Sequence, residues 1–343
     1  MGGKSPNVQA VLAAPSRAAL FLVMTVEAGG EPVVRELLGD LAGLVRSVGF
    51  RRPADRLTCV AGIGSQAWDR LFGGPRPAGL HPFVPLRGAR HTAPSTPGDV
   101  VFHVRAQQAD LCFELGTLIT RRMAGAVRVV DEVQGFTYFD QRDLLGFVDG
   151  TENPEGNPAV EAVHVGDEDP DFAGGSYLIV QKYLHDLDGW DRIGSDEQER
   201  VIGRTKLSDI ELPDGVQAPD SHVAVNQVLD EDGEERQIYR ANMPFGSPGR
   251  GEYGTYFAGY CRTPEVTEQM LRNMFLGTDE ASHDRILDFS TAVTGSLFHV
   301  PTADFLEDGP AADADASTSE RQQPEKDGSL GIGSLKPAPV RAD

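Results

Sequence analysis

Cysteine is scarce in this sequence, and no apolar run is long. Three cysteines, Cys59, Cys112 and Cys261, lie far apart among 343 residues and never form a CxxC pair. This spacing predicts neither a disulfide framework nor a zinc knuckle, and it is typical of a protein of the reducing cytoplasm. The longest apolar run, Ala18 to Val26, is much shorter than the roughly 20 residues that cross a bilayer. We therefore expect neither a membrane span nor an export signal.

Basic residues are also in short supply. Lysine and arginine number 31 against 52 aspartates and glutamates, which gives a net charge of −21. A chain of this charge repels phosphate backbones and anionic lipids, so we expect no nucleic-acid or membrane partner. The hydrophobic fraction of 40% and the charged fraction of 24% are those of a globular protein. The length favours two domains over one.

The hydrophobic pattern of the first half alternates between strand and helix periods. The segment 33–48 carries apolar residues at helical spacing, and it follows a run rich in β-branched and aromatic residues. The expected strands are 18–26, 56–63, 100–104 and 127–133, and the expected helices are 33–48 and 111–123. The order β-α-β-β-α-β predicts a ferredoxin-like α+β unit with a four-stranded antiparallel sheet. A doubly wound parallel sheet is the alternative.

The second half contains the parts for the same unit again. Strand-like segments at 177–183 and 255–260 and a helix-like segment at 265–276 are separated by loops, the longest of which is the Asp-, Gly- and Pro-rich stretch 145–174. From about Leu306 the composition is that of a solvated linker. We therefore predict a tandem of ferredoxin-like domains, with bounds at 9–145 and 146–305, and a flexible tail at 306–343.

Two familiar cofactor motifs are weak or missing. Residues 62–67 match the loose dinucleotide pattern GxGxxA, but the region about 20 residues later, 80–85, holds prolines and no acid, so a glycine turn is the better interpretation. None of the eight histidines forms an HxH or HExxH pair. That absence counts against zinc but not against haem, which needs only one protein ligand.

Three residues stand where a functional side chain is plausible. His222 lies where polar turn residues give way to apolar ones, although a lone histidine is usually structural. Asp149, in GFVDGTENP, belongs either to a pair of turns or to a glycine-flanked backbone that lies flat against a planar ligand. Arg240 is either an ordinary surface residue or a buried cation that needs an anionic partner.

Five segments together resemble one enzyme family. They are GFVDGTENP, IGRTK (202–206), SHVAVN (221–226), IYRANMPFG (238–246) and HDRILDFS (283–290). In order and approximate spacing they resemble the dye-decolourising peroxidases, most closely the compact bacterial branch, over roughly residues 10–305. The resemblance implies two ferredoxin-like domains and one non-covalent haem b. The absence of CxxCH agrees with a non-covalent haem.

The resemblance also implies roles for individual residues and a reaction. Hydrogen peroxide would oxidise the haem, and dyes, phenolic compounds and other one-electron donors would reduce it again. Either Asp149, a weak base that shuttles protons best at acidic pH, or Arg240, a fixed positive charge, would dominate peroxide cleavage. The implied residues are His222 as the axial iron ligand, Asp284 as its hydrogen-bond partner, Asp149, Arg240 and Asn242 on the distal side, and Arg204 beside a haem propionate.

The tail contains one short apolar segment, residues 327–336. Its aliphatic residues, Leu330, Ile332 and Leu335, are separated by glycine and serine, a composition that by itself favours a frayed end. The segment resembles the targeting peptides that load cargo into encapsulin shells. That resemblance implies an encapsulin shell as partner, a cytoplasmic location inside the nanocompartment, and a homo-oligomer, with a hexamer among the expected forms. The alternatives are a haem-binding, iron-releasing protein of deferrochelatase type and a catalytically idle cargo protein.

Overall fold

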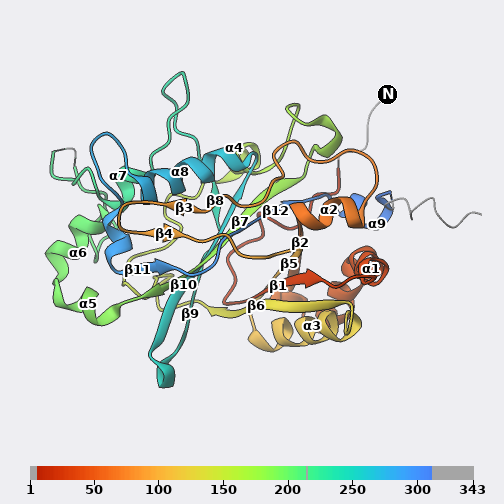
Figure 1. Ribbon diagram of the computed structural model, residues 1–343. Coiled ribbons are helices and arrows are strands. Elements are labelled where there is room, and N and C mark those ends of the chain that lie inside the picture. The colour runs from red at the N-terminus through yellow and green to blue at the C-terminus, as the bar shows by residue number, and fades with distance from the viewer. Residues whose placement is uncertain (1–5, 214, 311–343) are drawn as a thin grey trace, which may run out of the picture. The chain divides into compact units, whose positions relative to one another are not determined.

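The computed structural model describes residues 6–213 and 215–310 of the chain. Within them ten strands form one sheet in which every pairing is antiparallel, and a two-stranded hairpin, β3–β4, lies outside it (Figure 1). The strands are β1 Ala18–Val26, β2 Thr58–Gly64, β3 Leu86–Arg87, β4 Thr92–Ala93, β5 Val100–Ala106, β6 Val127–Phe136, β7 Ser176–His185, β8 Tyr239–Arg240, β9 Met243–Ser247, β10 Glu252–Cys261, β11 Ser290–Ala292 and β12 Ser296–Val300.

The helices lie between these strands. They are α1 Glu31–Gly49, α2 Ser65–Leu71, α3 Ala109–Arg122, α4 Gly156–Val163, α5 Leu187–Arg192, α6 Ser195–Ile202, α7 His222–Asn226, α8 Pro264–Leu276 and α9 Ala303–Asp308, with the 3-10 turn η4 at Arg285–Asp288. Among the described residues, no helix combines the length and the apolar character that a membrane crossing requires.

The sheet consists of two ferredoxin-like units joined edge to edge. The strand order β6-β1-β5-β2 places the fourth strand of the first unit beside its first, and β12-β7-β10-β8 repeats that order in the second unit, with β9 also paired to β10. The units meet where β2 pairs with β12 at Gly64–Phe298 and Ile63–His299. The predicted α+β class with antiparallel four-stranded units is confirmed.

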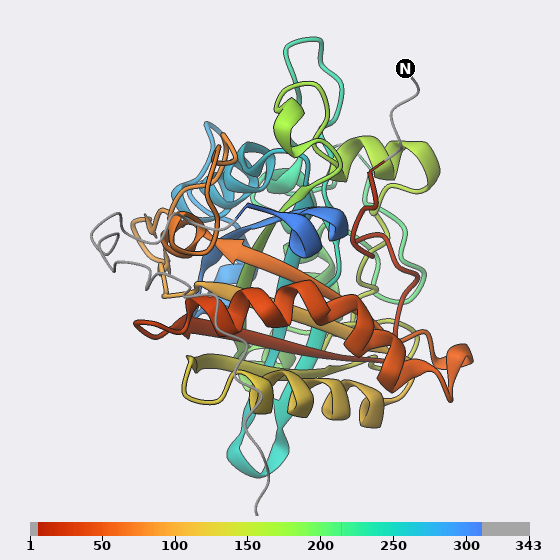
Figure 2. The same ribbon diagram turned by 90° about the vertical axis from the view of Figure 1, so that its right-hand side faces the viewer.

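Each face of β1 packs into a different core because successive side chains of a strand point to opposite faces. Leu20 and Leu22 pack toward α1 and α3, whose apolar residues recur at helical spacing. Figure 2 shows both helices running alongside β1. Phe21 points the other way and stacks on Tyr256 of β10 with ring centroids 4.2 Å apart. The sheet therefore curls so that its two units share a barrel-like core.

Two expectations from the sequence were wrong. Part of the stretch 145–174, expected as loop, forms α4, where Ala159 and Val163 lie four residues apart and are both buried. The chain is also still folded beyond Leu306, which is 7% exposed within α9. The guanidinium of Arg35 in α1 donates hydrogen bonds to the carbonyl oxygens of Gly309 and Pro310 at 3.0 Å each, and this fixes the end of α9.

Candidate active site

A cavity of about 920 Å³, including its open mouth, lies in the second unit between the segment 143–149, β7, β8, β10, α7 and α8. Its apolar walls are Leu145, Phe147, Val148, Ile202, Ile238, Phe257, Met270, Leu271, Met274 and Ile286. Its polar lining includes Asp143, Asp149, His222, Asn226, Arg240 and Asn242.

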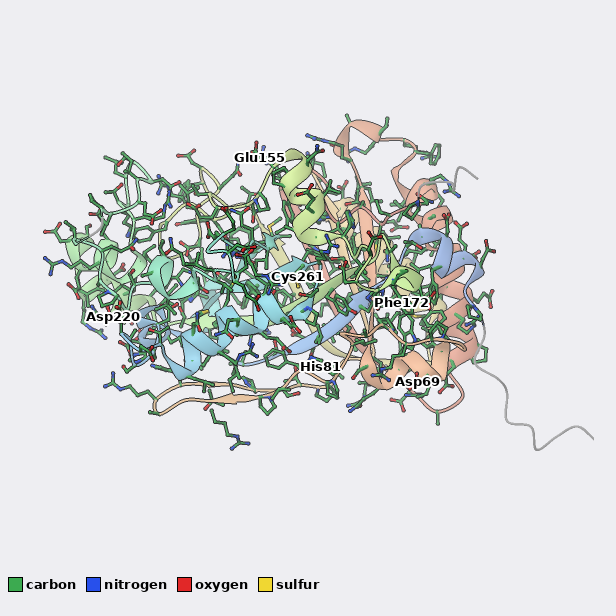
Figure 3. The ribbon with its side chains drawn as sticks, turned by 90° about the horizontal axis from the view of Figure 1, so that it is seen from above. Asp69, His81, Glu155, Phe172, Asp220 and Cys261 are labelled. Atoms are coloured by element: carbon green, nitrogen blue, oxygen red, sulfur yellow. The ribbon has the colours of Figure 1, made fainter. Side chains whose placement is uncertain are left out.

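His222 is the first residue of α7, a helix that begins where the Ser221 hydroxyl accepts a hydrogen bond from the Ala224 N–H at 3.4 Å. Asp220, two residues before His222, lies at the opposite end of the molecule from Asp69 of α2 (Figure 3). The turn η4 is tied to this segment because the Arg285 N–H donates to the Asp220 carbonyl at 3.1 Å. This contact brings the start of η4 beside α7.

The His222 ring is oriented by a buried carboxylate. Its Nδ1 lies 2.7 Å from Oδ2 of Asp284, whose side chain is 0% exposed. The other oxygen of Asp284 accepts a hydrogen bond from the Ile286 N–H at 2.9 Å. Asn226, one helical turn after His222, donates to the His222 carbonyl at 2.7 Å. A carboxylate at Nδ1 favours the tautomer whose Nε2 carries a lone pair. No hydrogen bond to Nε2 occurs within the described residues.

Asp149 and Asn242 form a second polar pair in the same cavity. The Asn242 amide donates to Oδ1 of Asp149 at 3.1 Å, and its oxygen accepts from the Ala258 N–H of β10 at 3.1 Å. Burial raises the pKa of the Asp149 carboxyl above its ordinary value, and the Asn242 hydrogen bond and the charge of Arg240 oppose that rise. The carboxyl is therefore a better proton acceptor than the ordinary aspartate that the sequence suggests.

Arg240 is held through its backbone. Its N–H donates to the Asn153 side-chain oxygen at 2.8 Å, and the Asn153 amide donates back to the Arg240 carbonyl at 2.8 Å. Desolvation lowers the pKa of the guanidinium, against the charges of Asp149 and Glu152, but an arginine stays protonated at any pH that a protein meets. The segment 149–153 and strand β8 thus place a carboxyl and a fixed cation in one cavity.

Sequence reasoning missed Asp143, a second carboxyl in the cavity wall. Its Oδ1 accepts a hydrogen bond from the Phe147 N–H at 3.0 Å. Burial raises the pKa of this carboxyl to about 7, and the nearby charge of Asp149 acts in the same direction. The sequence offers one signal, an acid six residues before Asp149, but acids in loops are too common for that signal to be specific.

Arg204 lines an adjoining hollow that also touches His222, Asp149 and Arg240. Its guanidinium is surrounded by acids. The Nε atom lies 3.0 Å from Asp209, and Nη1 lies 2.5 Å from Glu152 and 3.7 Å from Glu211. The structure thus places Arg204 near the predicted site but in contact with protein carboxylates. The targeting residues Leu330, Ile332 and Leu335 lie outside the described residues.

The residues that line the cavity fit a largely apolar group that carries an iron atom. The cavity combines broad apolar walls with one imidazole whose Nδ1 is engaged and whose Nε2 has no partner among the described side chains. Haem iron takes such an imidazole nitrogen as its axial ligand. The second histidine in this wall, His185, has both ring nitrogens within 3.0 Å of hydroxyl groups, Ser290 Oγ and Thr255 Oγ1. The fold and this cavity define an α+β enzyme with a haem-type pocket.

Family models match nearly the whole described chain. The model for the Dyp-type peroxidase N-terminal domain covers residues 8–137, and that for the C-terminal domain covers 140–305. A dye-decolorizing peroxidase from Mycolicibacterium paratuberculosis is 61% identical over 328 residues, which are 96% of this chain and 92% of the relative. A deferrochelatase from Escherichia coli is 25% identical over 60% of this chain and 57% of its own length.

Solved structures agree with the family models. The encapsulated DyP-type peroxidase from Mycobacterium smegmatis is 60% identical, with a TM-score of 0.89, over 90% of this chain and 100% of that one. A DypB variant from Rhodococcus jostii in complex with heme is 55% identical, with a TM-score of 0.86, over 88% of this chain and 98% of that one. The chain therefore belongs to the Dyp-type peroxidase family, whose members are haem-dependent, and the expected peroxidase class is confirmed.

Proposed function

We propose that this chain binds haem b without a covalent bond and uses hydrogen peroxide to oxidise dyes, phenolic compounds and other one-electron donors. One observation carries the proposal. The cavity that presents His222, with Nδ1 engaged by Asp284, also presents Asp149, Arg240 and Asn242. A basic ligand nitrogen, a proton acceptor and a fixed cation are the groups that peroxide cleavage requires.

His222 would hold the haem iron in this proposal. Because Asp284 accepts the Nδ1 proton, Nε2 keeps its lone pair for the metal. The negative charge of Asp284 makes the imidazole a stronger electron donor, and a stronger donor favours oxidised iron. A bound haem would supply the redox chemistry, in which peroxide accepts two electrons and the donors restore them one at a time.

Asp149 and Arg240 handle the proton and the charge of peroxide. Reduction of one peroxide consumes two electrons and two protons and releases two water molecules. Oδ1 of Asp149 accepts a hydrogen bond from the Asn242 amide. Oδ2 would therefore take a proton from one peroxide oxygen and pass it to the other, the leaving oxygen. Arg240 stabilises the negative charge that develops on the leaving oxygen.

Arg204 keeps its proposed place beside a haem propionate. A propionate that approaches Arg204 also approaches Glu152, which is half exposed and can turn toward solvent, whereas Asp209 is mostly buried. Propionate binding therefore replaces the Arg204–Glu152 contact and leaves the Arg204–Asp209 ion pair in place. Glu152 and a propionate each carry one negative charge, so Arg204 keeps the same number of anionic partners after the exchange.

An iron-releasing function is the alternative. The deferrochelatase similarity, 25% over 60% of the chain, is far weaker than the similarity to dye-decolorizing peroxidases, 61% over 96%. We therefore prefer the peroxidase.

We further propose that residues 327–336 direct this enzyme, as a homo-oligomer such as a hexamer, into an encapsulin compartment. The encapsulated relative from Mycobacterium smegmatis supports this. Leu330, Ile332 and Leu335 bring roughly 1.5–3 kcal/mol each of gross burial, from which ordering costs subtract, so several tails per oligomer act together. Truncation after Pro324 should leave dye oxidation intact and abolish co-purification with a co-expressed shell. Equal loading of the truncated protein would refute the packaging role.

The visible spectrum of the purified protein tests the haem site. His222→Ala should lose most bound haem or change its axial-ligand spectrum, and dye oxidation with peroxide should fall with it. The matched control is His185→Gln, which alters the other histidine of the same cavity and should keep the spectrum of a histidine-ligated haem. A wild-type spectrum and full turnover in His222→Ala would show that the assignment is wrong. Haem binding with iron release and no peroxide turnover would favour the alternative.

A further inference from the structure

A cluster of two histidines and one aspartate lies outside the haem-type cavity. His91 is in the turn between β3 and β4, His283 follows α8, and Asp288 is the last residue of η4. Oδ1 of Asp288 lies 3.2 Å from Nε2 of His91 and 3.1 Å from Nε2 of His283. One ligand atom from each residue lies within 4.8 Å of the other two. None of the three residues lines the cavity that contains His222.

These distances match the coordination sphere of a zinc ion. Zn–N bonds of about 2.0–2.1 Å and Zn–O bonds of about 2.0–2.2 Å place neighbouring ligand atoms of a tetrahedral site roughly 3.3 Å apart. Both nitrogen–oxygen distances in the cluster agree with that spacing to within about 0.2 Å. We propose that His91, His283 and Asp288 bind one Zn²⁺ or a similar divalent transition ion, with water as the fourth ligand.

The scaffold holds the two imidazoles in place before an ion arrives. Gly88 lets the β3–β4 hairpin approach the end of α8, because a Cβ atom there would lie 1.8 Å from the Phe275 carbonyl oxygen. The Gly88 N–H donates to the His91 carbonyl at 3.0 Å and closes the turn that presents His91. Nδ1 of His283 lies 2.9 Å from the Ser282 hydroxyl, so its Nε2 is directed at Asp288. Hydrogen bonds of this kind to the second ring nitrogen orient metal-binding histidines.

Among the described residues, two cations lie near Asp288, and one of them, Arg285, is paired with Glu197 at 2.6 Å. Nη1 of Arg90 lies 3.8 Å from Oδ1 of Asp288, but the Arg90 side chain is 67% exposed and can move into solvent. The net charge of −21 favours cation binding over the molecule as a whole. Without an ion, the same residues form a hydrogen-bonded cluster in which one carboxylate oxygen serves two imidazoles. Substitution of Arg90 distinguishes a metal site from a hydrogen-bonded cluster. Loss of this positive charge strengthens the binding of a cation, but it does not strengthen hydrogen bonds from neutral imidazoles to Asp288.

The ion has a structural role in this proposal. Asp288 ends the turn η4, and Asp284, which holds His222, caps its start. Zinc would therefore tie the β3–β4 hairpin to the turn that positions the partner of His222. The side chains of His91 and Asp288 are partly exposed, 22% and 30%, which gives an ion access from solvent. The zinc site does not depend on the haem assignment.

Calorimetric titration of the chelator-washed holoenzyme with zinc chloride tests the site. The wild-type protein should bind one zinc ion per chain in the micromolar range or tighter. His91→Gln should weaken zinc binding at least tenfold, since loss of even an outer partner of a metal ligand costs about 10–100-fold in affinity. Arg90→Gln should bind zinc more tightly than the wild type. The matched control is His81→Gln, because His81 pairs with Glu268 and takes no part in the cluster.

A second measurement locates the ion independently of affinity. Anomalous X-ray scattering at the zinc edge from soaked crystals should give a peak between His91, His283 and Asp288. The circular dichroism of His91→Gln should match that of the wild type, because His91 lies in a hairpin turn at the surface. The proposal is overturned if the wild type binds no zinc, if His91→Gln binds as the wild type does, if Arg90→Gln fails to bind more tightly, or if the peak lies elsewhere.

Discussion

The carboxyl of Asp143 should make the stability of this protein depend on pH in an unusual direction. Most aspartates ionise more easily in the folded state, and they stabilise the fold as pH rises. Burial in the cavity wall instead raises the pKa of Asp143 from an ordinary 3.8 to about 7. Between these two values the folded protein keeps a proton that the unfolded chain has released. The contribution of Asp143 is therefore complete below about pH 4 and is lost as pH rises through 7.

The size of this loss follows from the shift in pKa. One pKa unit corresponds to about 1.4 kcal/mol, so a rise of roughly three units corresponds to about 4 kcal/mol over the whole range. Linkage places about 2–3 kcal/mol of it between pH 5 and pH 8. These figures are ceilings because the Asp143 side chain is partly exposed, and solvent contact screens its charge. An asparagine side chain cannot titrate, so Asp143→Asn removes this pH dependence and nothing else of comparable size.

Urea unfolding of the holoenzyme at pH 5, 6, 7 and 8 measures the effect. The buried indoles of Trp68 and Trp190 report the transition by fluorescence. The free energy of unfolding of the wild type, relative to that of Asp143→Asn, should fall by up to about 2–3 kcal/mol between pH 5 and pH 8. The control is Asp140→Asn, an exposed aspartate three residues away, which should follow the wild type at every pH. Parallel curves for the wild type and Asp143→Asn would refute the reasoning.

Three further predictions concern the cavity. Asp284→Asn removes the charge beside His222 and should lower the rate of reaction with peroxide about 10–100-fold and raise the haem reduction potential, measured by stopped flow and spectroelectrochemistry. Asn242→Ala removes the hydrogen bond that lowers the pKa of Asp149, so the pH profile of the peroxide reaction should shift to higher pH, and an unshifted profile would contradict the contact. Arg240→Leu should slow the same step about 10²–10³-fold with haem fully bound, and a wild-type rate would exclude Arg240 from charge stabilisation.

The long elements of the fold were predictable because their hydrophobic periods are local. The helix expected at 33–48 is α1, Glu31–Gly49, and the strand expected at 127–133 is β6, Val127–Phe136. Short elements were missed because two turns of helix carry too few residues to establish a period. The helix α4 lies in a Gly- and Pro-rich stretch, and only its packing, with Val163 fully buried, stabilises it.

The candidate site was only partly predictable for a similar reason. His222, Asp149, Arg240 and Asn242 were expected and line one cavity. Their catalytic roles stay predictions. The unusual environment of Asp143 depends on how the segment 143–149 folds over it, and no sequence spacing encodes that. His222 and Asn226 are four residues apart in the sequence. A helix of five residues is too short to predict, so this spacing did not indicate that the two residues interact.

The narrow junction between β2 and β12 has a consequence for how the two units depend on each other. Two residue pairs join these strands, so backbone pairing contributes little to their association. Side-chain contacts contribute most of the association between the two units. Phe21 of the first unit stacks on Tyr256 of the second, and His103 forms a hydrogen bond with Tyr260 at 2.8 Å. A polypeptide divided between β6 and β7 should therefore yield fragments that precipitate when made separately and reassemble when made together, much as the subunits of an obligate heterodimer do.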